Sequence, residues 1–278
     1  MRPKRTQPAH RAALIAALGL AIAAITPSAA SADPLKEAIA SEQRTEKNAA
    51  RDKYRHPYEV LSFFGITADM RVVEIWPASG WWTEILAPYL AKDGKYYAAY
   101  FPDNDFLPFY KPARKRFSKK LEGSPELYSE VELTTFFPPG QDEIAPAGSV
   151  DAVLTFRNVH NWIRFQFEQQ AFNQFYTALK PGGVLGVVEH RAKPGITVEQ
   201  MDKTGYVTVE YTKQLAQKAG FVFEGSSEVN ANPADTKDHP KGVWTLPPTN
   251  ALKDTDKEKY QAIGESDRYV LKFRKPEA

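Results

Sequence analysis

Short apolar runs alternate along this chain with segments whose apolar residues recur every three or four positions. The runs Arg71–Ile75, Val150–Phe156 and Val184–Val188 are rich in β-branched residues and show no polar alternation, which is typical of strands buried on both faces. The segment after the first run has helical spacing, and Phe165–Leu179 has it between the other two. This alternation of strands and helices predicts an α/β domain with a parallel sheet.

Weaker patterns complete the predicted sheet. Four further segments read as strands, of which the last alternates clearly: 95–100, 130–134, 221–229 and 268–275. Further helices are expected at 57–64, 112–121 and 207–219, the first of them ended by Gly65. The polar, alanine-rich segment 33–56 is expected to form one or two surface helices with a solvated charged face.

The turn after the first strand is the main candidate for a binding site. Glu74 stands near the end of this strand, and Pro77-Ala78-Ser79-Gly80 leads into the next helix. A strand, a tight turn and a helix start direct backbone N–H groups to the carboxyl edge of a sheet, where open α/β folds bind ligands. A turn that binds no ligand is the alternative, because one glycine-containing loop is a weak signal.

Polar clusters also follow the other two buried strands. Arg157, Asn158 and His160 come after the second, and Glu189-His190 ends the third. Such groups are costly to bury without partners, so a ligand explains them; helix capping is the other explanation. His160 is a candidate general base, because the unperturbed imidazole pKa lies near neutrality. No metal site is predicted, since His160, Glu189 and His190 lack a close ligand spacing in the sequence.

The segment 71–90 resembles the first motif of the class I S-adenosylmethionine-dependent methyltransferases. Glu74 matches the acidic position and Gly80 the last of three alternate glycines, while Trp76 and Ala78 stand at the first two. LKPGGVLGVVEH is similar to the family's Pro-Gly-Gly turn and fifth strand. EIWPASGWWTEILAP, FRNVHNW and GESDRYVLKF resemble a group of exported predicted methyltransferases. The resemblance implies a Rossmann-like seven-stranded, mostly parallel sheet with an antiparallel last strand and helices on both faces.

The resemblance also implies roles for particular residues. The cofactor would be S-adenosylmethionine, with Asp103 at the ribose, unless it is a plain turn aspartate, and Asp142 at the adenine amino group. The implied cofactor-binding residues are Glu74, Trp76, Ser79, Gly80, Asp103, Asp142, Arg157 and Asn158. The residues implied to face the acceptor are His160, Tyr206 and His190. Because Trp76 could fill the space meant for the methionine part of the cofactor, the loop is either a modified site or a degenerate one.

Residues 1–32 read as a secretory signal peptide. A basic start precedes the apolar run Ala12–Ile25, and Ala30-Ser31-Ala32 resembles a cleavage site. The run is shorter than the roughly 20 residues of a membrane span, although an uncleaved anchor is the alternative. We therefore expect export to the periplasm or the exterior, with no stable membrane span after cleavage. The absence of cysteine is compatible with an oxidising compartment.

Charge and domain organisation narrow the function. Loss of the four basic residues in 1–32 would lower the formal charge from +2 to −2, which argues against nucleic-acid binding. The chain divides into the signal peptide, the helical segment 33–56 and a methyltransferase-like domain, 57–278. The leading hypothesis is an exported methyltransferase with a small-molecule acceptor. The alternative is a repurposed fold that binds another small ligand in a cleft lined by tryptophans.

Overall fold

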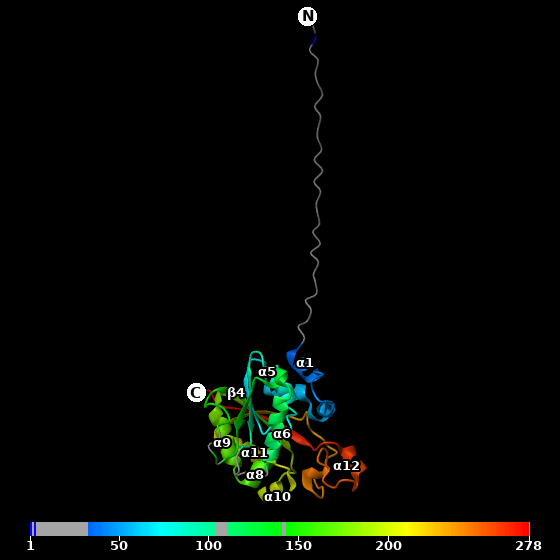
Figure 1. Ribbon diagram of the computed structural model, residues 1–278. Helices are drawn as coiled ribbons and strands as arrows, with labels where there is room; N and C mark the ends of the chain where they lie inside the picture. Colours follow the sequence, from blue (N-terminus) through cyan, green and yellow to red (C-terminus); the bar gives the residue numbers. More distant parts are fainter. Residues whose placement is uncertain (2, 4–32, 104–109, 139, 141–142, 278) are drawn as a thin grey trace. The chain divides into compact units, whose positions relative to one another are not determined.

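The computed structural model describes residues 1, 3, 33–103, 110–138, 140 and 143–277. The compact unit runs from Asp33 to Ala278 (Figure 1). The predicted signal peptide, apart from residues 1 and 3, lies outside the described residues, and so does Asp142. Within the described ranges, no helix is long and apolar enough to cross a membrane.

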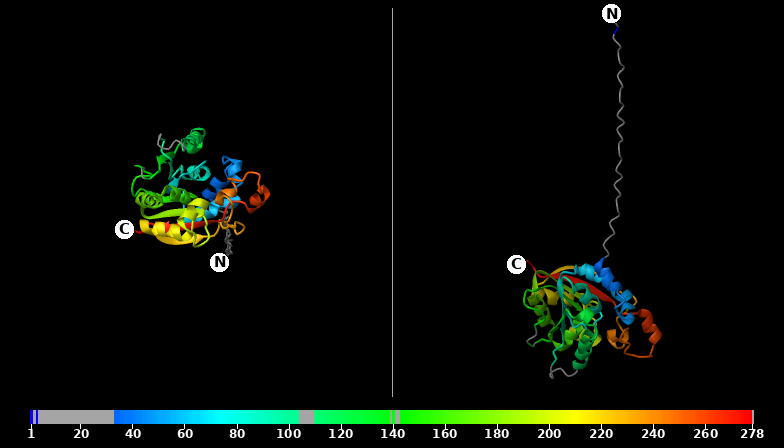
Figure 2. Two further views of the ribbon diagram at one scale, coloured as in Figure 1. Left: turned by 90° about the horizontal axis from the view of Figure 1, so that it is seen from below. Right: turned by 45° about the horizontal axis from the view of Figure 1, so that its top comes forward.

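One seven-stranded sheet forms the centre of the compact unit, with the strand order β3-β2-β1-β4-β5-β7-β6 (Figures 1 and 2). The strands are β1 Arg71–Ile75, β2 Lys95–Tyr100, β3 Val131–Thr135, β4 Val150–Phe156, β5 Leu179–His190, β6 Val222–Ser227 and β7 Arg268–Arg274. β7 runs antiparallel to both of its neighbours, and the other pairs are parallel. The predicted fold class, including the antiparallel last strand, is confirmed.

The buried strands were predicted most accurately, because helices cover both faces of the sheet. β1, β2 and β4 have the predicted bounds, and all but the first residue of β1 is buried. β5 begins at Leu179, so the Pro-Gly-Gly segment expected to be a turn belongs to the strand. The pairing register between β4 and β5 shifts at this point, from Val150 opposite Leu179 to Ala152 opposite Val184, which accommodates the extra residues.

The helices follow the predicted pattern with shifted ends. They are α1 Pro34–Ala40, α2 Glu46–Ala49, α3 Asp52–Arg55, α4 Pro57–Phe64, α5 Thr83–Leu90, α6 Lys111–Glu122, α7 Pro125–Tyr128, α8 Val159–Phe165, α9 Glu168–Ala178, α10 Val198–Thr204, α11 Val209–Ala219 and α12 Lys257–Ile263. The predicted helix 165–179 is shorter, since α8 ends at Phe165 and α9 begins only at Glu168. Pro88 lies inside α5, which ends two residues later.

A glycine in β5 lets the N-terminal helices approach the sheet. A Cβ atom at Gly186 would lie 2.8 Å from the Phe64 ring of α4 and equally close to Leu154. Phe64 is fully buried there. This contact holds α4 against the sheet, and α3, which directly precedes α4, is thereby brought to the carboxyl ends of the strands.

Candidate functional site

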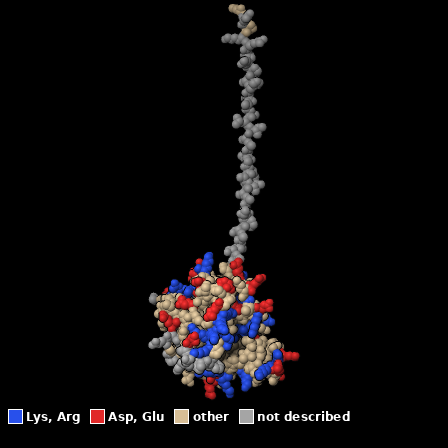
Figure 3. All heavy atoms as spheres, viewed as in Figure 1, with Lys and Arg blue, Asp and Glu red and all other residues tan. Residues whose placement is uncertain are grey.

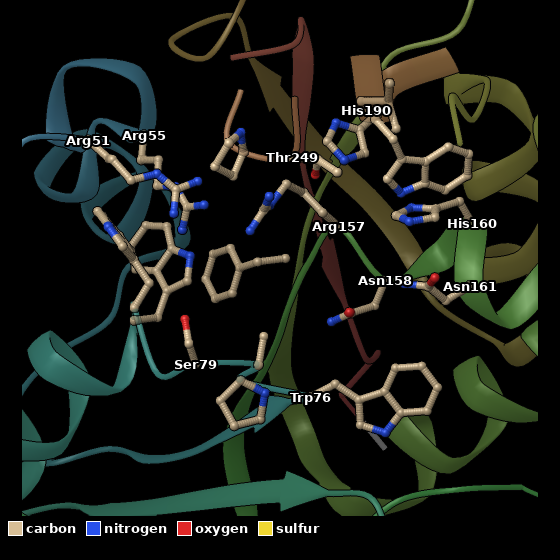
Figure 4. Close-up of a pocket in the computed structure, with 18 of the residues that line it drawn as sticks. Arg51, Arg55, Trp76, Ser79, Arg157, Asn158, His160, Asn161, His190 and Thr249 are labelled. Carbon is tan, nitrogen blue, oxygen red and sulfur yellow. The ribbon is translucent and has the colours of Figure 1, made fainter. Parts of the chain in front are cut away.

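A cavity of about 230 Å³ lies at the carboxyl ends of β1, β4 and β5. Its walls come from the loop after β1, the residues after β4, the end of β5, both ends of α3 and residues of the segment 243–249. Figure 4 shows Arg51 and Arg55 on one side, His160 and Asn161 on the other, and Arg157 between them. The site is therefore at the sheet edge that the sequence predicted, but α3 contributes a wall that it did not predict.

The loop after β1 has a left-handed backbone at three alternate positions. The φ angles are 48° at Trp76, 54° at Ala78 and 79° at Gly80. This conformation costs residues other than glycine about 1–2 kcal/mol each. The Tyr100 hydroxyl donates to the Ala78 carbonyl (2.9 Å), and the Trp76 indole N–H donates to the Phe136 carbonyl (2.8 Å). The loop thus keeps a strained shape that its surroundings enforce, which is characteristic of functional sites.

The Trp76 side chain lies among aromatic residues from the ends of β2 and β3. Its ring is 4.4 Å from that of Phe101 and stacks on Phe137 at 6.2 Å between centroids. The rings of Phe136 and Trp162 meet it edge-on. The indole therefore lies toward the strand ends to which the resemblance assigns ribose and adenine. Trp76 also lines the first cavity, so the expectation that it occupies the methionine part of the cofactor site stays a prediction.

A second cavity, of about 670 Å³, lies on the other side of the same loop. Ala78 and Ser79 line both cavities, so the loop forms the wall between them. The second cavity has aromatic walls, including Tyr100 and Phe117, and two cations from α6, Arg116 and Lys120. Figure 3 shows lysine and arginine side chains gathered over α6. The basic helix α6 thus contributes to the wall of this cavity.

Two predicted carboxylates do not act as charged ligand groups in this structure. Glu74 is buried and accepts a hydrogen bond from the Tyr96 hydroxyl (2.5 Å). Burial raises the pKa of its carboxyl to about 8, in spite of that hydrogen bond and the nearby charge of Arg55. Asp103 is exposed and lines neither cavity, so its expected role at the ribose is not supported. The described lining of the second cavity contains no carboxylate.

His160 and Glu189 form a buried pair at the ends of the neighbouring strands β4 and β5. The His160 Nδ1 atom lies 3.1 and 3.2 Å from the two carboxylate oxygens. The same carboxylate accepts hydrogen bonds from the backbone N–H groups of His160 (3.3 Å) and His190 (2.7 Å). Because a carboxylate can only accept, Nδ1 carries the hydrogen and Nε2 keeps its lone pair. His160 lines the first cavity and is thus arranged as a base.

His190 lies beside this pair as a neutral wall of the cavity. Its Nδ1 atom is 2.5 Å from the Ser266 hydroxyl, and its ring is 5.4 Å from that of His160. Burial, and then the electrostatic interactions with His160 and the nearby arginines, hold the pKa of His190 well below its usual range. Its expected place facing the acceptor is compatible with this position, since His190 lines the cavity.

The same three residues are close enough to be considered as metal ligands. One donor atom each of His160, Glu189 and His190 lies within 4.8 Å of the others. These three residues were considered as ligands from the sequence, but their spacing did not indicate that two neighbouring strand ends bring them together. The arginines beside the cluster disfavour a divalent cation, and the Glu189 carboxylate already binds three N–H groups. The arrangement favours an oriented base.

Tyr206 does not face the cavity as expected. It is 1% exposed, and its hydroxyl donates to the Asp235 carboxylate at 3.0 Å. It packs with Ala192 and Val243 in a small separate cluster. The aspartate that holds it comes from the long loop 230–250, so sequence spacing could not indicate the pairing.

Two other predicted residues line the first cavity and have identifiable contacts. The Asn158 amide donates to the Ile75 carbonyl (2.8 Å) and so ties the ends of β4 and β1 together. Arg157 has a left-handed backbone, with φ 63°. Within the described part of the chain, its guanidinium makes no hydrogen bond or ion pair.

The sequence reasoning missed the arginines of α3. Arg51 and Arg55 line the cavity, although the segment 33–56 was interpreted as a solvated surface. Tyr54 and His56, which stand in the same stretch before Pro57, do not line the cavity. The His56 ring instead contacts the Asn230 side chain at 3.0 Å. Arg51 and Arg55 both pair with Glu265, which lies more than 200 positions away in the sequence. No local pattern could therefore reveal that these arginines are buried.

Comparisons with known proteins give the class of this fold. No family model matches the chain, and no curated protein matches it. A crystal structure of a SAM dependent methyltransferase from Aquifex aeolicus is similar over 87% of this chain and 98% of its own, at 14% identity and a TM-score of 0.53. The [4+2]-cyclase SpnF is similar over 88% of this chain and 93% of its own, at 14% identity and 0.54. The chain has the class I methyltransferase fold.

The buried Glu74 predicts a distinctive dependence of stability on pH. Its carboxyl ionises near pH 4.5 in the unfolded chain and near 8 in the folded protein. Between these pH values the folded protein keeps a proton that the unfolded chain has lost. The contribution of Glu74 to the free energy of unfolding is therefore fully present below pH 4.5 and is lost as the pH rises through 8. As the pH rises from 5 to 8.5, the free energy of unfolding of the Glu74→Gln variant should therefore increase by up to about 4 kcal/mol relative to that of the wild type.

Urea unfolding across this pH range measures the difference. The exposed Glu126 provides the matched control, since Glu126→Gln should follow the wild type at every pH. Parallel curves for Glu74→Gln and the wild type would contradict the raised pKa of Glu74.

Proposed function

We propose that this protein is an exported S-adenosylmethionine-dependent methyltransferase that acts on a small-molecule acceptor. The observation that carries the proposal is the loop after β1. Its left-handed positions, 76, 78 and 80, are those that the resemblance assigns to glycine, and the loop stands at the binding edge of a class I methyltransferase fold. Two of these positions keep the strained backbone without glycine, which a turn with no ligand would not require.

The residues around the loop fit the cofactor in a changed position. In the first cavity, Ser79 and Asn161 offer donors for its carboxylate, and the stacked rings of Trp82 and Phe156 (4.1 Å) offer aromatic faces for a sulfonium. The loop after β3, to which the resemblance assigns adenine, does not fit it, because the Trp76 indole packs there against Phe136 and Phe137. The second cavity, with its aromatic walls and larger volume, suits the adenosine part instead.

The chain's own contribution to methyl transfer is to hold the acceptor and to remove its proton. The bound cofactor supplies an electrophilic methyl group on sulfur. The Nε2 lone pair of His160 takes the proton from the acceptor's nucleophilic atom as that atom gains its new bond. Glu189 holds the Nδ1 hydrogen and stabilises the imidazolium that results. Neutral His190 keeps a second positive charge away from this imidazolium.

A second candidate function is favoured by the same Trp76 side chain. A ring packed into the ordinary adenosine place is expected if the fold has been repurposed for another small ligand. The similarity to a protein named a [4+2]-cyclase supports this candidate, because it shows that the fold is not tied to one reaction name.

Calorimetric titration with S-adenosylmethionine and S-adenosylhomocysteine distinguishes the two candidates. The methyltransferase proposal predicts micromolar binding by the wild type. It also predicts a change below about threefold in Trp76→Gly, since the adenosine part would not use the indole's place. Gly80→Asp should abolish binding, because a Cβ there would lie 3.2 Å from Phe117 and Lys120 at a left-handed backbone.

The other results would favour the repurposed fold. No binding by well-folded wild-type protein would contradict the methyltransferase proposal. Binding gained only in Trp76→Gly would identify the indole as the group that closes the ancestral site. Circular dichroism spectra of each variant confirm that the fold is kept.

If His160 acts as the base, its substitution should lower the turnover number without a matching loss of cofactor affinity. His160→Gln should lower turnover of an active acceptor by about 10²–10⁴-fold, while the affinity for S-adenosylhomocysteine changes little. His56→Gln is the control, because His56 lines neither cavity. An equal loss of turnover and affinity in His160→Gln would point to a structural role for the ring.

Export is proposed from the amino-terminal segment. The basic start, apolar run and small residues before Asp33 support cleavage after Ala32. N-terminal sequencing of the protein recovered from the cell envelope or medium should begin at Asp33. Recovery in the cytoplasm with residues 1–32 retained would contradict export.

A further inference from the structure

Four arginines share one buried carboxylate at the edge of the first cavity. Arg51 Nε lies 2.6 Å from one oxygen of Glu265, and Arg268 Nη1 lies 3.0 Å from the other. Arg55 Nε lies 3.5 Å from the same second oxygen, and Arg157 acts on Glu265 by its charge. Burial alone would raise the pKa of Glu265, but the four positive charges lower it to about 2. The cluster carries three positive charges more than negative ones.

The surplus charge is accompanied by donors without acceptors. Arg55 is 3% exposed, and its Nε and Nη2 atoms have no hydrogen-bond partner among the described residues. The Nη2 atom of Arg51 is also buried without one. A buried guanidinium donor without an acceptor is destabilising, because it has lost its hydrogen bonds to water and gained none in return. Figure 4 shows Arg51, Arg55 and Arg157 turned toward the same part of the cavity.

The nearby acids do not neutralise the cluster. Glu74 holds its proton at neutral pH, because its pKa is about 8. The Glu189 carboxylate is bound by the His160 ring and two backbone N–H groups. The fourth arginine, Arg268, already has the Tyr54 and Ser266 carbonyls as acceptors. The buried donors of the cluster that lack a partner therefore belong to Arg51 and Arg55, and Arg157 beside them makes no hydrogen bond or ion pair in the described structure.

We propose that Arg51, Arg55 and Arg157 bind an oxyanion, the carboxylate or phosphate group of the small molecule that enters the first cavity. The flat guanidinium fork pairs with such groups through two parallel hydrogen bonds, and burial strengthens these bonds. An oxyanion would supply acceptors for the free donors and offset the repulsion among the three charges. The site needs no residue outside those that line the cavity.

The other walls of the cavity narrow the ligand further. Trp81 and Trp82 lie beside the arginines, with the Arg55 guanidinium 4.6 Å from the Trp81 ring. These flat walls and a volume of about 230 Å³ suit a small planar molecule. His160 stands across the cavity from Arg51 and Arg55. The acceptor is thus a small planar acid whose nucleophilic atom lies away from its anionic group. This assignment of the acceptor rests on the proposed function, whereas the binding of an oxyanion does not.

The carboxylate of the cofactor's methionine part is the other oxyanion that the three arginines would bind in the same way. The resemblance assigns Arg157 to the cofactor, and the proposal reassigns it to the acceptor. The two sources differ in one testable respect. An acceptor anion binds together with the cofactor, whereas the cofactor's carboxylate would compete with a simple oxyanion for the arginines.

Calorimetric titration with benzoate and inorganic phosphate tests the oxyanion site, with neutral benzamide as the comparison. Benzoate and phosphate should bind, and benzamide should bind at least tenfold more weakly than benzoate. Arg157→Gln should weaken benzoate binding tenfold or more, because it removes a charge-assisted pair. Arg274→Gln changes the net charge equally but removes an arginine that pairs with Glu224 at the far edge of the sheet, and it should leave binding unchanged.

Thermal unfolding separates this role from a structural one. Arg157→Gln should unfold at a higher temperature than the wild type, since burial penalises this charge and no hydrogen bond or ion pair in the described structure offsets the penalty. A lower unfolding temperature, with benzoate binding unchanged, would overturn the proposal. Equal binding of benzoate and benzamide, or no binding of benzoate and phosphate, would also overturn it.

The source of the oxyanion is tested by competition. Saturating S-adenosylhomocysteine should leave benzoate binding in place. Displacement of benzoate by S-adenosylhomocysteine, but not by 5′-methylthioadenosine, which has no carboxylate, would overturn the assignment to the acceptor. If neither nucleoside binds, the methyltransferase proposal fails, while the difference between the wild type and Arg157→Gln still decides whether the oxyanion site exists.

Discussion

The single carboxylate of Glu265 holds together charged groups from three distant parts of the chain. Arg51 and Arg55 lie at the two ends of α3, Arg157 directly follows β4, and Arg268 begins β7. Removing one partner of a buried ion pair typically costs 3–5 kcal/mol, because it leaves an uncompensated charge. The amino-terminal helices therefore complete the cavity as well as covering the sheet.

The cavity combines two arrangements that stability alone would not select. The loop after β1 keeps left-handed backbone at Trp76 and Ala78, and the arginines keep donors without acceptors. Both are costs that bound molecules could offset. Trp76 and Ala78 stand at two of the positions that the resemblance assigns to glycine, and the loop keeps the left-handed backbone at both.

The sequence predicted the sheet well because buried strands have a strong local pattern. β1 and β4 are continuous apolar runs, and their bounds were correct to the residue. The antiparallel last strand came from the resemblance to a family. His160 and His190 were placed at the same edge from strand ends alone, and the parallel pairing of β4 and β5 brings them together. The hydrogen bonding of His160 with Glu189 could not be predicted, since side-chain direction at a strand end depends on packing.

The errors concern side chains whose partners lie far away in the sequence. Arg51 and Arg55 looked like part of a solvated face, because nothing near them marks the buried Glu265. Tyr206 looked available until the loop 230–250 supplied Asp235. In each case tertiary contacts changed the environment of a polar residue without changing its local pattern. Charge surplus in a cavity is a property of the assembled fold, and only the structure shows it.

The central claim, that surplus positive charge makes this cavity a site for small planar acids, is tested most directly by an anomalous-difference map of crystals soaked in 4-bromobenzoate. The account predicts a bromine peak inside the first cavity on the side of His160, with the carboxylate against Arg51, Arg55 and Arg157. A bromine peak beside the arginines would contradict this claim, because the carboxylate would then be turned away from them. The absence of any bromine peak in the cavity of a fully soaked crystal would also contradict it.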